Sequence, residues 1–217
     1  HFSGGMAARC LGIDCVWHLQ DFISERFWGI QRRVFGLFSR FYPRAIVVDG
    51  TPIAHQLPRA IQQRVTVLLN GIDTALFHPG IDGQPVRSQF GISPEDLVLG
   101  HAARLTPWKG QHYLLEAFAL LAPRYPGLRL LLVGSPLFDN DAYERRLRAR
   151  VTELGLGDRV IFTGFRRDLP QVLASMDIFA YPSVEKDTSP LALLSAMAAG
   201  LPVAAFDIDG VREVLLD

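Results

Sequence analysis

Short apolar runs alternate with amphipathic stretches along the sequence. We predict strands at eight of these runs, because each is rich in aliphatic or β-branched residues and bounded by polar, glycine or proline positions. The runs show no clean alternation with polar residues, which is typical of strands buried on both faces of a parallel sheet. The predicted strands are Cys15–His18, Ala45–Val48, Val65–Leu69, Leu97–Ala102, Leu128–Val133, Arg159–Thr163, Ile178–Tyr181 and Val203–Phe206.

Helices are predicted between these strands. Apolar residues recur at helical spacing in 111–121 and 141–154, and a further helix is expected over 191–199. Alternating strands and helices at this spacing predict an α/β fold with open parallel sheets. In such sheets ligands bind beyond the carboxyl ends of the strands.

The segment 77–87 interrupts this rhythm. It holds two prolines and two glycines and has no hydrophobic period, so we predict a linker. The expected organisation is a partial first domain over 1–77, a linker over 78–86 and a second domain over 87–217. Both domains are expected to be Rossmann-like, with a ligand cleft between them.

Composition narrows the function. Apolar residues make up 49% of the 217 positions, which excludes general disorder, and 22 basic residues balance 22 acidic ones, which argues against nucleic-acid binding. The two cysteines, Cys10 and Cys15, exclude a disulfide scaffold and favour a reducing cytoplasm. Because the sequence starts at His1 and stops at Asp217 directly after an apolar run, we expect a fragment of a longer protein.

Two cations follow the predicted strand 97–102. Arg104 and Lys109 lie in the loop between this strand and a helix that starts near Gly110. A guanidinium, an ammonium and the free N–H groups of a helix start together suit a diphosphate. The alternative is that both side chains are ordinary surface charges, but their place after a buried strand favours an anion site.

Three further strand ends are candidates. Gly134 ends one strand, and Gly164 with Phe165 ends another, where the backbone can approach a ligand and an aromatic ring can line a base pocket. Such an aromatic more often packs in a core. The loop before the helix at 191 carries acids and hydroxyls, of which Ser189 is a candidate helix cap, with Pro190 near the first turn.

Five phrases in series resemble the retaining family 4 glycosyltransferases: LLNGIDTALFHP, AARLTPWKGQHYLLEAF, LLLVGSP, VIFTGF and YPSVEKDTSPLALLSAMAAGLPVAAFDIDGVREVL. The resemblance implies the GT-B fold, with a nucleotide-sugar bound mainly by the second domain and no metal or other cofactor. It matches Arg104 and Lys109 to a diphosphate-binding pair. Gly134, Gly164 and Phe165 then lie near the nucleotide.

The resemblance also implies roles for residues that line the sugar. His18 corresponds to a histidine that often faces the donor sugar, and the start of the helix at Ser189, Pro190 and Leu191 would face sugar hydroxyls and phosphate. The family signature has two Glu residues eight positions apart, but this sequence has Asp187 and Ser195 there. Asp187 can still accept hydrogen bonds from sugar hydroxyls. Losing the second carboxylate costs on the order of 1.5–3 kcal/mol of donor binding.

The expected function is transfer of a sugar, with retention, from a nucleoside diphosphate sugar to a glycan or lipid-linked acceptor. Ser195 motivates one alternative, a non-catalytic GT-B binding module. A sugar-nucleotide epimerase is a weaker alternative. The expected location is the cytoplasm, with a further hypothesis of peripheral contact at the inner face of the membrane. That hypothesis rests on aromatic and arginine residues in 26–42, although such a stripe more often packs in the core.

Overall fold

The computed structural model describes residues 2–23, 30–136, 141–185 and 187–216. The chain divides into two compact units. Unit 1 contains residues 1–70, 186–190 and 209–217, and unit 2 contains residues 71–185 and 191–208. Each unit is therefore built from segments that are far apart in the sequence.

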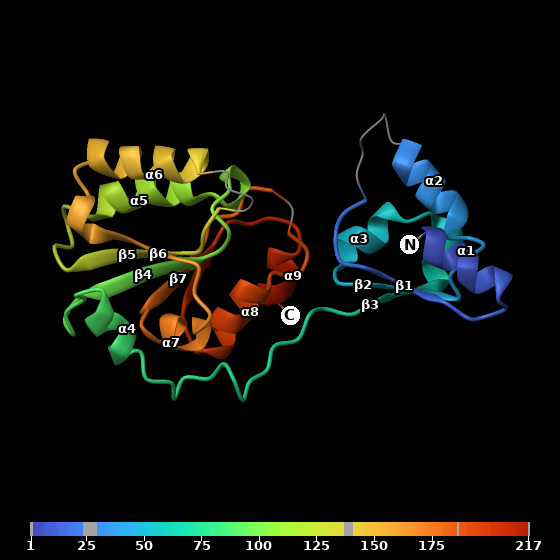
Figure 1. Cartoon of the computed structure of the whole chain (residues 1–217), viewed down its shortest axis with the longest axis horizontal. Coiled ribbons are helices and arrows are strands. Elements are labelled where there is room, and N and C mark those ends of the chain that lie inside the picture. The colour runs from blue at the N-terminus through green and yellow to red at the C-terminus, as the bar shows by residue number, and fades with distance from the viewer. Residues whose placement is uncertain (1, 24–29, 137–140, 186, 217) are drawn as a thin grey trace. The chain divides into compact units, whose positions relative to one another are not determined.

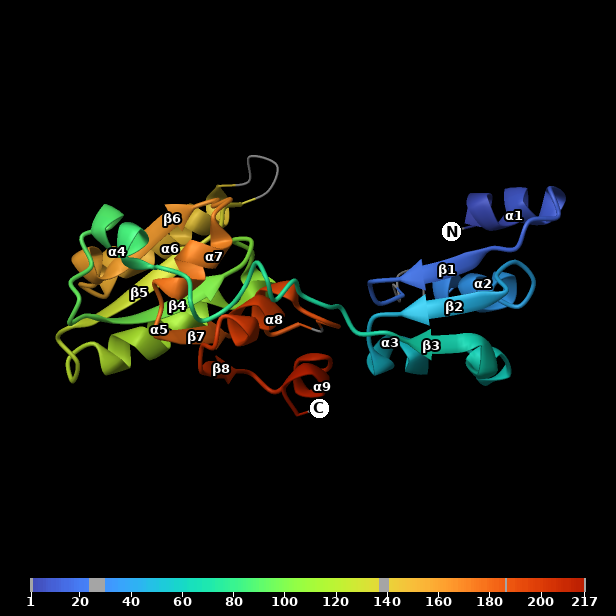
Figure 2. The same ribbon diagram turned by 90° about the horizontal axis from the view of Figure 1, so that it is seen from below.

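Unit 1 contains a three-stranded parallel sheet in the order β1-β2-β3, whose strands lie side by side in Figure 2. The apolar side chains of β1 and β2 pack against helices on one face of this sheet, with Trp17, Ile46 and Val48 buried beside Phe35 and Ile53. The strands are β1 (Val16–Leu19), β2 (Ala45–Val48) and β3 (Val65–Val67), and the helices are α1 (Phe2–Cys10), α2 (Ile30–Phe38), α3 (Thr51–Gln56), the 3-10 helix η1 (Arg59–Arg64) and α9 (Val211–Leu216).

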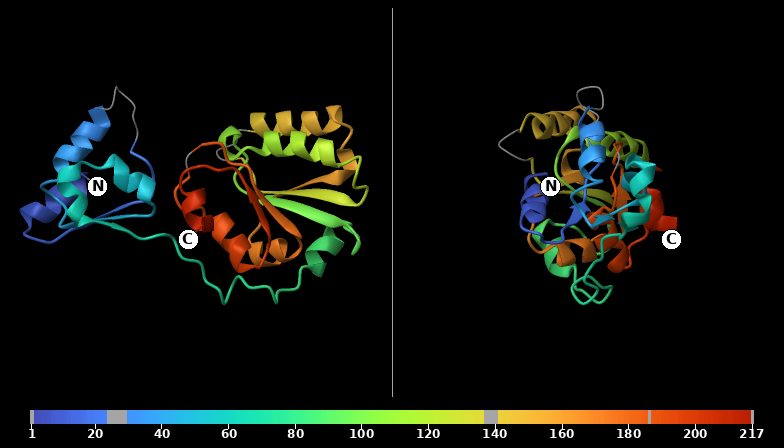
Figure 3. Two further views of the ribbon diagram at one scale, coloured as in Figure 1. Left: turned by 180° about the vertical axis from the view of Figure 1, so that it is seen from behind. Right: turned by 90° about the vertical axis from the view of Figure 1, so that its right-hand side faces the viewer.

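Unit 2 contains a five-stranded parallel sheet in the order β6-β5-β4-β7-β8, which is the doubly wound arrangement. Helices α5 and α6 cover one face of this sheet, and α4, α7 and α8 lie on the other (Figures 1 and 3). The strands are β4 (Leu97–Ala102), β5 (Leu128–Val133), β6 (Val160–Gly164), β7 (Ile178–Tyr181) and β8 (Val203–Ala205). The helices are α4 (Gln84–Gln89), η2 (Pro107–Lys109), α5 (Gln111–Leu121), α6 (Ala142–Glu153), η3 (Gly157–Arg159), α7 (Leu169–Ala174) and α8 (Leu191–Ala198).

All eight predicted strands are present, and the prediction of parallel sheets is confirmed. Four strands have the predicted bounds, and the others differ by one or two residues at an end. The helices expected over 111–121, 141–154 and 191–199 are α5, α6 and α8. Residues 26–29 of the predicted amphipathic stretch lie outside the described residues, residues 30–38 form α2, and residues 39–42 form the turn that follows it.

Burial of strands on both faces holds at the centre of unit 2 but is wrong for β1. In β5, Leu130, Leu131 and Leu132 are all fully buried. In β1 burial alternates, because Trp17 and Leu19 face the helices whereas Val16 is 60% exposed. The strand lies at an edge of its sheet, and its two faces therefore meet different surroundings.

The segment predicted as a linker is not wholly irregular. Residues 71–83 contain no helix or strand, but α4 begins at Gln84, inside the predicted limits of 78–86. Pro85 occupies the first turn of α4, where its missing N–H costs no hydrogen bond, so this proline starts a helix instead of breaking one. The domain limits at 77 and 87 stay a prediction.

Candidate nucleotide-sugar site

Arg104 and Lys109 converge on one aromatic ring. The guanidinium carbon of Arg104 lies 5.4 Å from the centre of the Trp108 ring, and the Nζ of Lys109 lies 4.2 Å from the same centre. Both cations follow β4, the central strand of the sheet in unit 2, at its carboxyl end. The π electrons of the ring attract each positive group and leave its charge in place.

Tyr181 fixes the position of the Lys109 ammonium. The Nζ of Lys109 donates a hydrogen bond of 3.0 Å to the Tyr181 hydroxyl, and it lies 5.4 Å from the centre of that ring. Tyr181 is 1% exposed and ends β7, the strand next to β4. The two neighbouring strand ends therefore supply the cation and its support.

The turn before α5 depends on Gly110. Its φ of 76° lies in the left-handed region, and a Cβ there would lie 1.8 Å from the carbonyl oxygen of Pro182. The same approach allows Val184 N–H and the Ser183 hydroxyl to donate to the Trp108 carbonyl, at 2.9 and 3.1 Å. The loop after β7 is thus held against the loop that carries the two cations.

Two buried polar side chains support this loop from below. Gln111, at the start of α5, donates through its amide nitrogen to the Arg104 carbonyl at 2.8 Å and lies 3.4 Å from Nε2 of His101. His101 is completely buried, and its Nδ1 lies 2.9 Å from the Ala180 carbonyl oxygen. Burial, together with the charge of Lys109, lowers the pKa of His101 to about 4, so the ring is neutral near pH 7.

A pocket of about 370 Å³ opens beside Arg104. Gly134 borders it with a φ of 132°, and a Cβ there would lie 2.0 Å from the Ala103 carbonyl oxygen, so only glycine fits. Phe165 also borders it and is 71% exposed, which favours a role in lining the pocket over packing in the core. The lining is Ala102, Ala103, Arg104, Val133, Gly134, Ser135, Phe165, Arg166, Leu169 and Ala192.

The structure divides the predicted site residues between the units. Arg104, Lys109, Gly134, Gly164, Phe165, Leu191 and Ser195 belong to unit 2, and His18, Asp187, Ser189 and Pro190 belong to unit 1. Arg104, Gly134 and Phe165 line the same pocket. Ala192, in the first turn of α8, also lines it. Gly164 is the residue before Phe165 and has a φ of 70°, with open space where a Cβ would lie.

Ser189 makes two hydrogen bonds with Asn70. Its hydroxyl accepts a hydrogen bond of 3.0 Å from the backbone N–H of Asn70, and its carbonyl accepts one of 2.9 Å from the Asn70 side-chain amide. Asn70 and Gly71 form an Asn-Gly pair, a residue pattern that by itself predicts a turn. The paired bonds fix the segment that precedes α8, so Asn70 is a structural residue that the sequence did not reveal.

A buried carboxylate in unit 1 was also missed. Asp49 directly follows β2, is 3% exposed, and its Oδ1 has no hydrogen-bond partner among the described residues. Burial raises the pKa of Asp49, and the hydroxyl of Thr188 and the charge of His18 oppose that rise. His18 itself is exposed on β1. A lone Asp after an apolar strand carries no distinguishing sequence signal, which explains the omission.

Ser195 faces the interior of unit 2. It is 2% exposed, and its hydroxyl donates to the Leu191 carbonyl, four residues earlier in α8, at 2.8 Å. The hydroxyl therefore replaces neither the charge nor the reach of a carboxylate at this position. That Ser195, at the second signature position, helps to bind the donor stays a prediction.

Among the described residues, no group of three His, Cys, Asp or Glu side chains is arranged to hold a metal ion. The expectation of a metal-independent reaction stays a prediction. Within the same residues, no helix combines the length and the apolar character needed to cross a membrane.

Parallel sheets in two α/β units, with a cationic loop and a pocket at the strand ends of the second, define a GT-B protein. Solved structures agree: Anabaena HepE in complex with UDP is 31% identical with a TM-score of 0.89, and the match covers 98% of this chain and 58% of that one. HepE was also solved with UDP and glucose and with UDP-glucose, at TM-scores of 0.86 and 0.85.

The family described as Glycosyl transferases group 1 matches residues 96–217. This chain belongs to that family. The lipopolysaccharide core biosynthesis mannosyltransferase LpsB of Rhizobium meliloti is 31% identical over 150 residues, covering 69% of this chain and 42% of the relative. A D-inositol 3-phosphate glycosyltransferase of Mycobacterium marinum is 33% identical over 177 residues, which cover 79% of this chain and 37% of that relative. The chain thus spans less than half the length of these relatives.

Proposed function

We propose that this chain is part of a retaining glycosyltransferase that uses a nucleoside diphosphate sugar. Arg104 and Lys109 bind the diphosphate. When the bond between the anomeric carbon and the diphosphate oxygen breaks, the diphosphate keeps the electron pair, and the two positive charges stabilise it. The observation that carries the proposal is that both cations lie within 5.4 Å of the centre of the Trp108 ring, and that Arg104 also lines the 370 Å³ pocket. Gly134 lets the ligand approach the backbone, and Phe165 offers a ring face to the base.

The HepE structures support the choice of ligand, because that protein was solved with UDP and with UDP-glucose. Calorimetry with UDP and GDP tests it. Lys109→Ala removes one charged contact and is expected to weaken binding tenfold or more. Arg124→Ala removes an exposed cation from the same unit and serves as the matched control. No binding, or binding unchanged in the Lys109 variant, would contradict the proposal.

Retention and the acceptor require separate evidence. We propose a glycan or lipid-linked acceptor and transfer with retention, on the basis of the family resemblance, with His18 and Asp187 facing the donor sugar. The anomeric configuration of the product, read by NMR, tests retention. An inverted product would contradict it. Release of free epimerised sugar nucleotide without any acceptor would favour the epimerase instead.

The second candidate is a binding module without turnover. The burial of Ser195 and the use of its hydroxyl inside α8 favour it, because no carboxylate is available there for the ribose hydroxyls. Sugar transfer by the natural sequence, extended to full length, would exclude this candidate. Donor binding without transfer would support it.

A further inference from the structure

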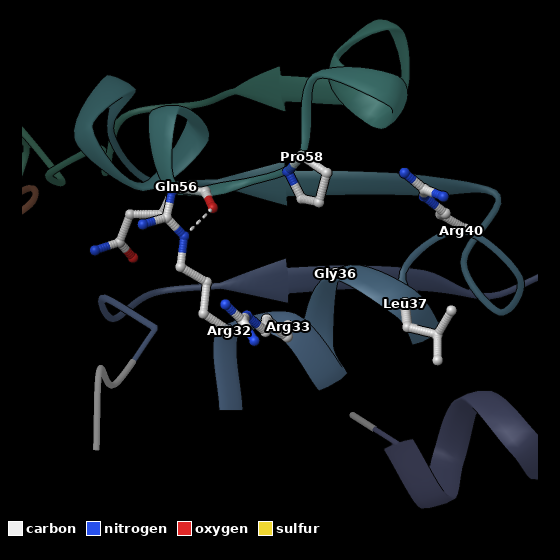
Figure 4. A pocket seen from close by; sticks show the side chains of 7 residues that line it. All are labelled: Arg32, Arg33, Gly36, Leu37, Arg40, Gln56 and Pro58. Carbon is white, nitrogen blue, oxygen red and sulfur yellow. Dashed lines mark hydrogen bonds between the residues drawn. The ribbon is translucent and has the colours of Figure 1, made fainter. Parts of the chain in front are cut away.

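A groove lined by three arginines lies in unit 1. Its volume is about 570 Å³, larger than that of the pocket beside Arg104. Figure 4 shows Arg32 and Arg33 at one end, Arg40 at the other, and Gly36 with Pro58 between them. Among the described residues, the lining is Arg32, Arg33, Gly36, Leu37, Arg40, Gln56 and Pro58, which includes three cations and no acid.

The spacing of these residues shapes the groove. Arg32, Gly36 and Arg40 are four residues apart, which aligns them along one side of α2 and the turn that follows it. Gly36 lets Pro58 pack closely against the backbone of α2, because a Cβ at this position would lie 2.8 Å from Cγ of Pro58. These two residues form the floor of the groove. At 1.5 Å per residue, the two outer arginines are attached about 12 Å apart.

The positive charge of the groove is available to a ligand. Arg32 uses its Nε to donate to the Gln56 carbonyl at 3.0 Å, a neutral partner. Arg33 and Arg40 are exposed, and neither has a carboxylate partner among the described residues. The whole chain has no net charge, so this concentration of cations is local. Arg64 also donates to the Ser39 and Arg40 carbonyls, which fixes the end of α2.

We propose that the groove binds a sugar carrying two phosphate groups. Guanidinium forks at each end grip phosphate oxygens, for which planar paired donors are well suited. Leu37 and Pro58 lie between the ends and pack against the carbon-bound hydrogens of the sugar ring. A bilayer would require a flat or convex face, whereas these cations line a recess. This binding does not depend on the proposed donor site of unit 2.

Calorimetry with defined probes tests this site. Glucose 1,6-bisphosphate carries two phosphates on one ring, glucose 6-phosphate carries one, and glucose carries none. We expect affinity to fall in that order. The double variant Arg32→Gln, Arg40→Gln is expected to weaken bisphosphate binding at least tenfold. Arg9→Gln with Arg124→Gln lowers the charge equally at exposed positions and is expected to leave binding unchanged.

The donor site is separated by its own variant. Arg104→Gln with Lys109→Gln is expected to remove UDP binding and to leave bisphosphate binding intact. Loss of UDP binding alone, or absence of UDP binding from the natural protein, therefore bears on the proposed function and not on the groove. Should the Arg32 and Arg40 double variant fail to fold, Arg33→Gln and Arg40→Gln are measured singly, since both side chains are exposed.

Two results would overturn the proposal. One is equal affinity for glucose 1,6-bisphosphate in the natural protein and in the groove variants, or no binding at all. The other is sedimentation with vesicles of 30% phosphatidylglycerol in phosphatidylcholine that the groove variants abolish, without binding of the soluble bisphosphate. That second pattern would make this face a membrane contact.

Discussion

The Nζ of Lys109 donates a hydrogen bond of 3.0 Å to the hydroxyl of Tyr181, which is almost wholly buried at the end of the adjacent strand. The ammonium is therefore held from one side while it lies over the Trp108 ring. This contact joins the central strand pair of unit 2 to the proposed diphosphate site. Substitution of the aromatic residues therefore tests the site as directly as substitution of the cations.

Tyr181→Phe removes that hydroxyl and keeps the ring. We expect UDP affinity to fall by roughly threefold to tenfold, because the ammonium loses a positioning partner but keeps its charge. Calorimetry with UDP measures the change. Tyr125→Phe, which alters a half-exposed tyrosine in the same unit, is the control. Equal affinities in both variants would show that Tyr181 does not position Lys109 for the ligand.

Gly134→Ala tests the close approach of two strand ends. The added Cβ would lie 2.0 Å from the Ala103 carbonyl oxygen, so the loops must move apart, and we expect a loss of more than about 2 kcal/mol in unfolding free energy. Gly155→Ala is the matched control, since Gly155 also has a positive φ of 65° but open space around it. That control is expected to lose about 1 kcal/mol. Urea titration distinguishes them, and equal losses would contradict the steric argument.

His101 predicts a pH dependence of stability. Its pKa falls from 6.5 to about 4 on folding, because burial disfavours the charged ring. Between these values the unfolded chain binds a proton that the folded chain does not, so stability decreases as pH falls from about 6.5 to about 4. The total is on the order of 3 kcal/mol.

His101→Asn keeps a donor near the Ala180 carbonyl and removes the titrating ring. We expect it to flatten the stability profile in this pH range, measured by urea titration at successive pH values. His55→Asn, at an exposed position, is expected to keep the slope. A slope that survives in the His101 variant would assign the effect to another group.

Ser195→Ala separates a structural role from a ligand contact. The hydroxyl bonds only within its own helix, so we expect UDP affinity within twofold of the natural protein and a stability change below about 1 kcal/mol. Calorimetry and urea titration read the two quantities. A large loss of affinity with unchanged stability would show that Ser195 reaches the ligand.

The buried Arg87 of α4 is expected to contribute more to the free energy of unfolding than an exposed arginine does. Arg87 is 8% exposed, bonds Asp177 at 2.7 Å and donates to the Ser175 and Asp96 carbonyls. Arg87→Met removes the donor of the two carbonyls, whereas Asp177 keeps its hydrogen bond from the Val98 N–H, and we expect a cost of about 2–3 kcal/mol of unfolding free energy. The exposed pair of Arg148 with Glu144 is the comparison, and Arg148→Met is expected to cost less than about 1 kcal/mol. Comparable losses would contradict this ranking.

Local pattern was sufficient for the strands, because runs such as Leu128–Val133 are apolar along their whole length and end at glycine. The place of Arg104 and Lys109 followed from the same logic, since a loop after a central strand is where such sheets bind ligands. The partners of those residues could not be predicted. Tyr181 lies 72 positions from Lys109, and Asn70 lies 119 positions from Ser189. Only folding brings them together.

Unit 1 is completed by two late stretches of chain, 186–190 and 209–217. The backbone N–H of Thr51, at the start of α3, donates a hydrogen bond of 2.9 Å to the Glu213 carboxylate. During synthesis, residues 1–70 leave the ribosome long before these stretches exist. Unit 1 therefore stays incomplete until the chain of unit 2 has been translated, and a protein that ended at residue 70 would lack both of these stretches.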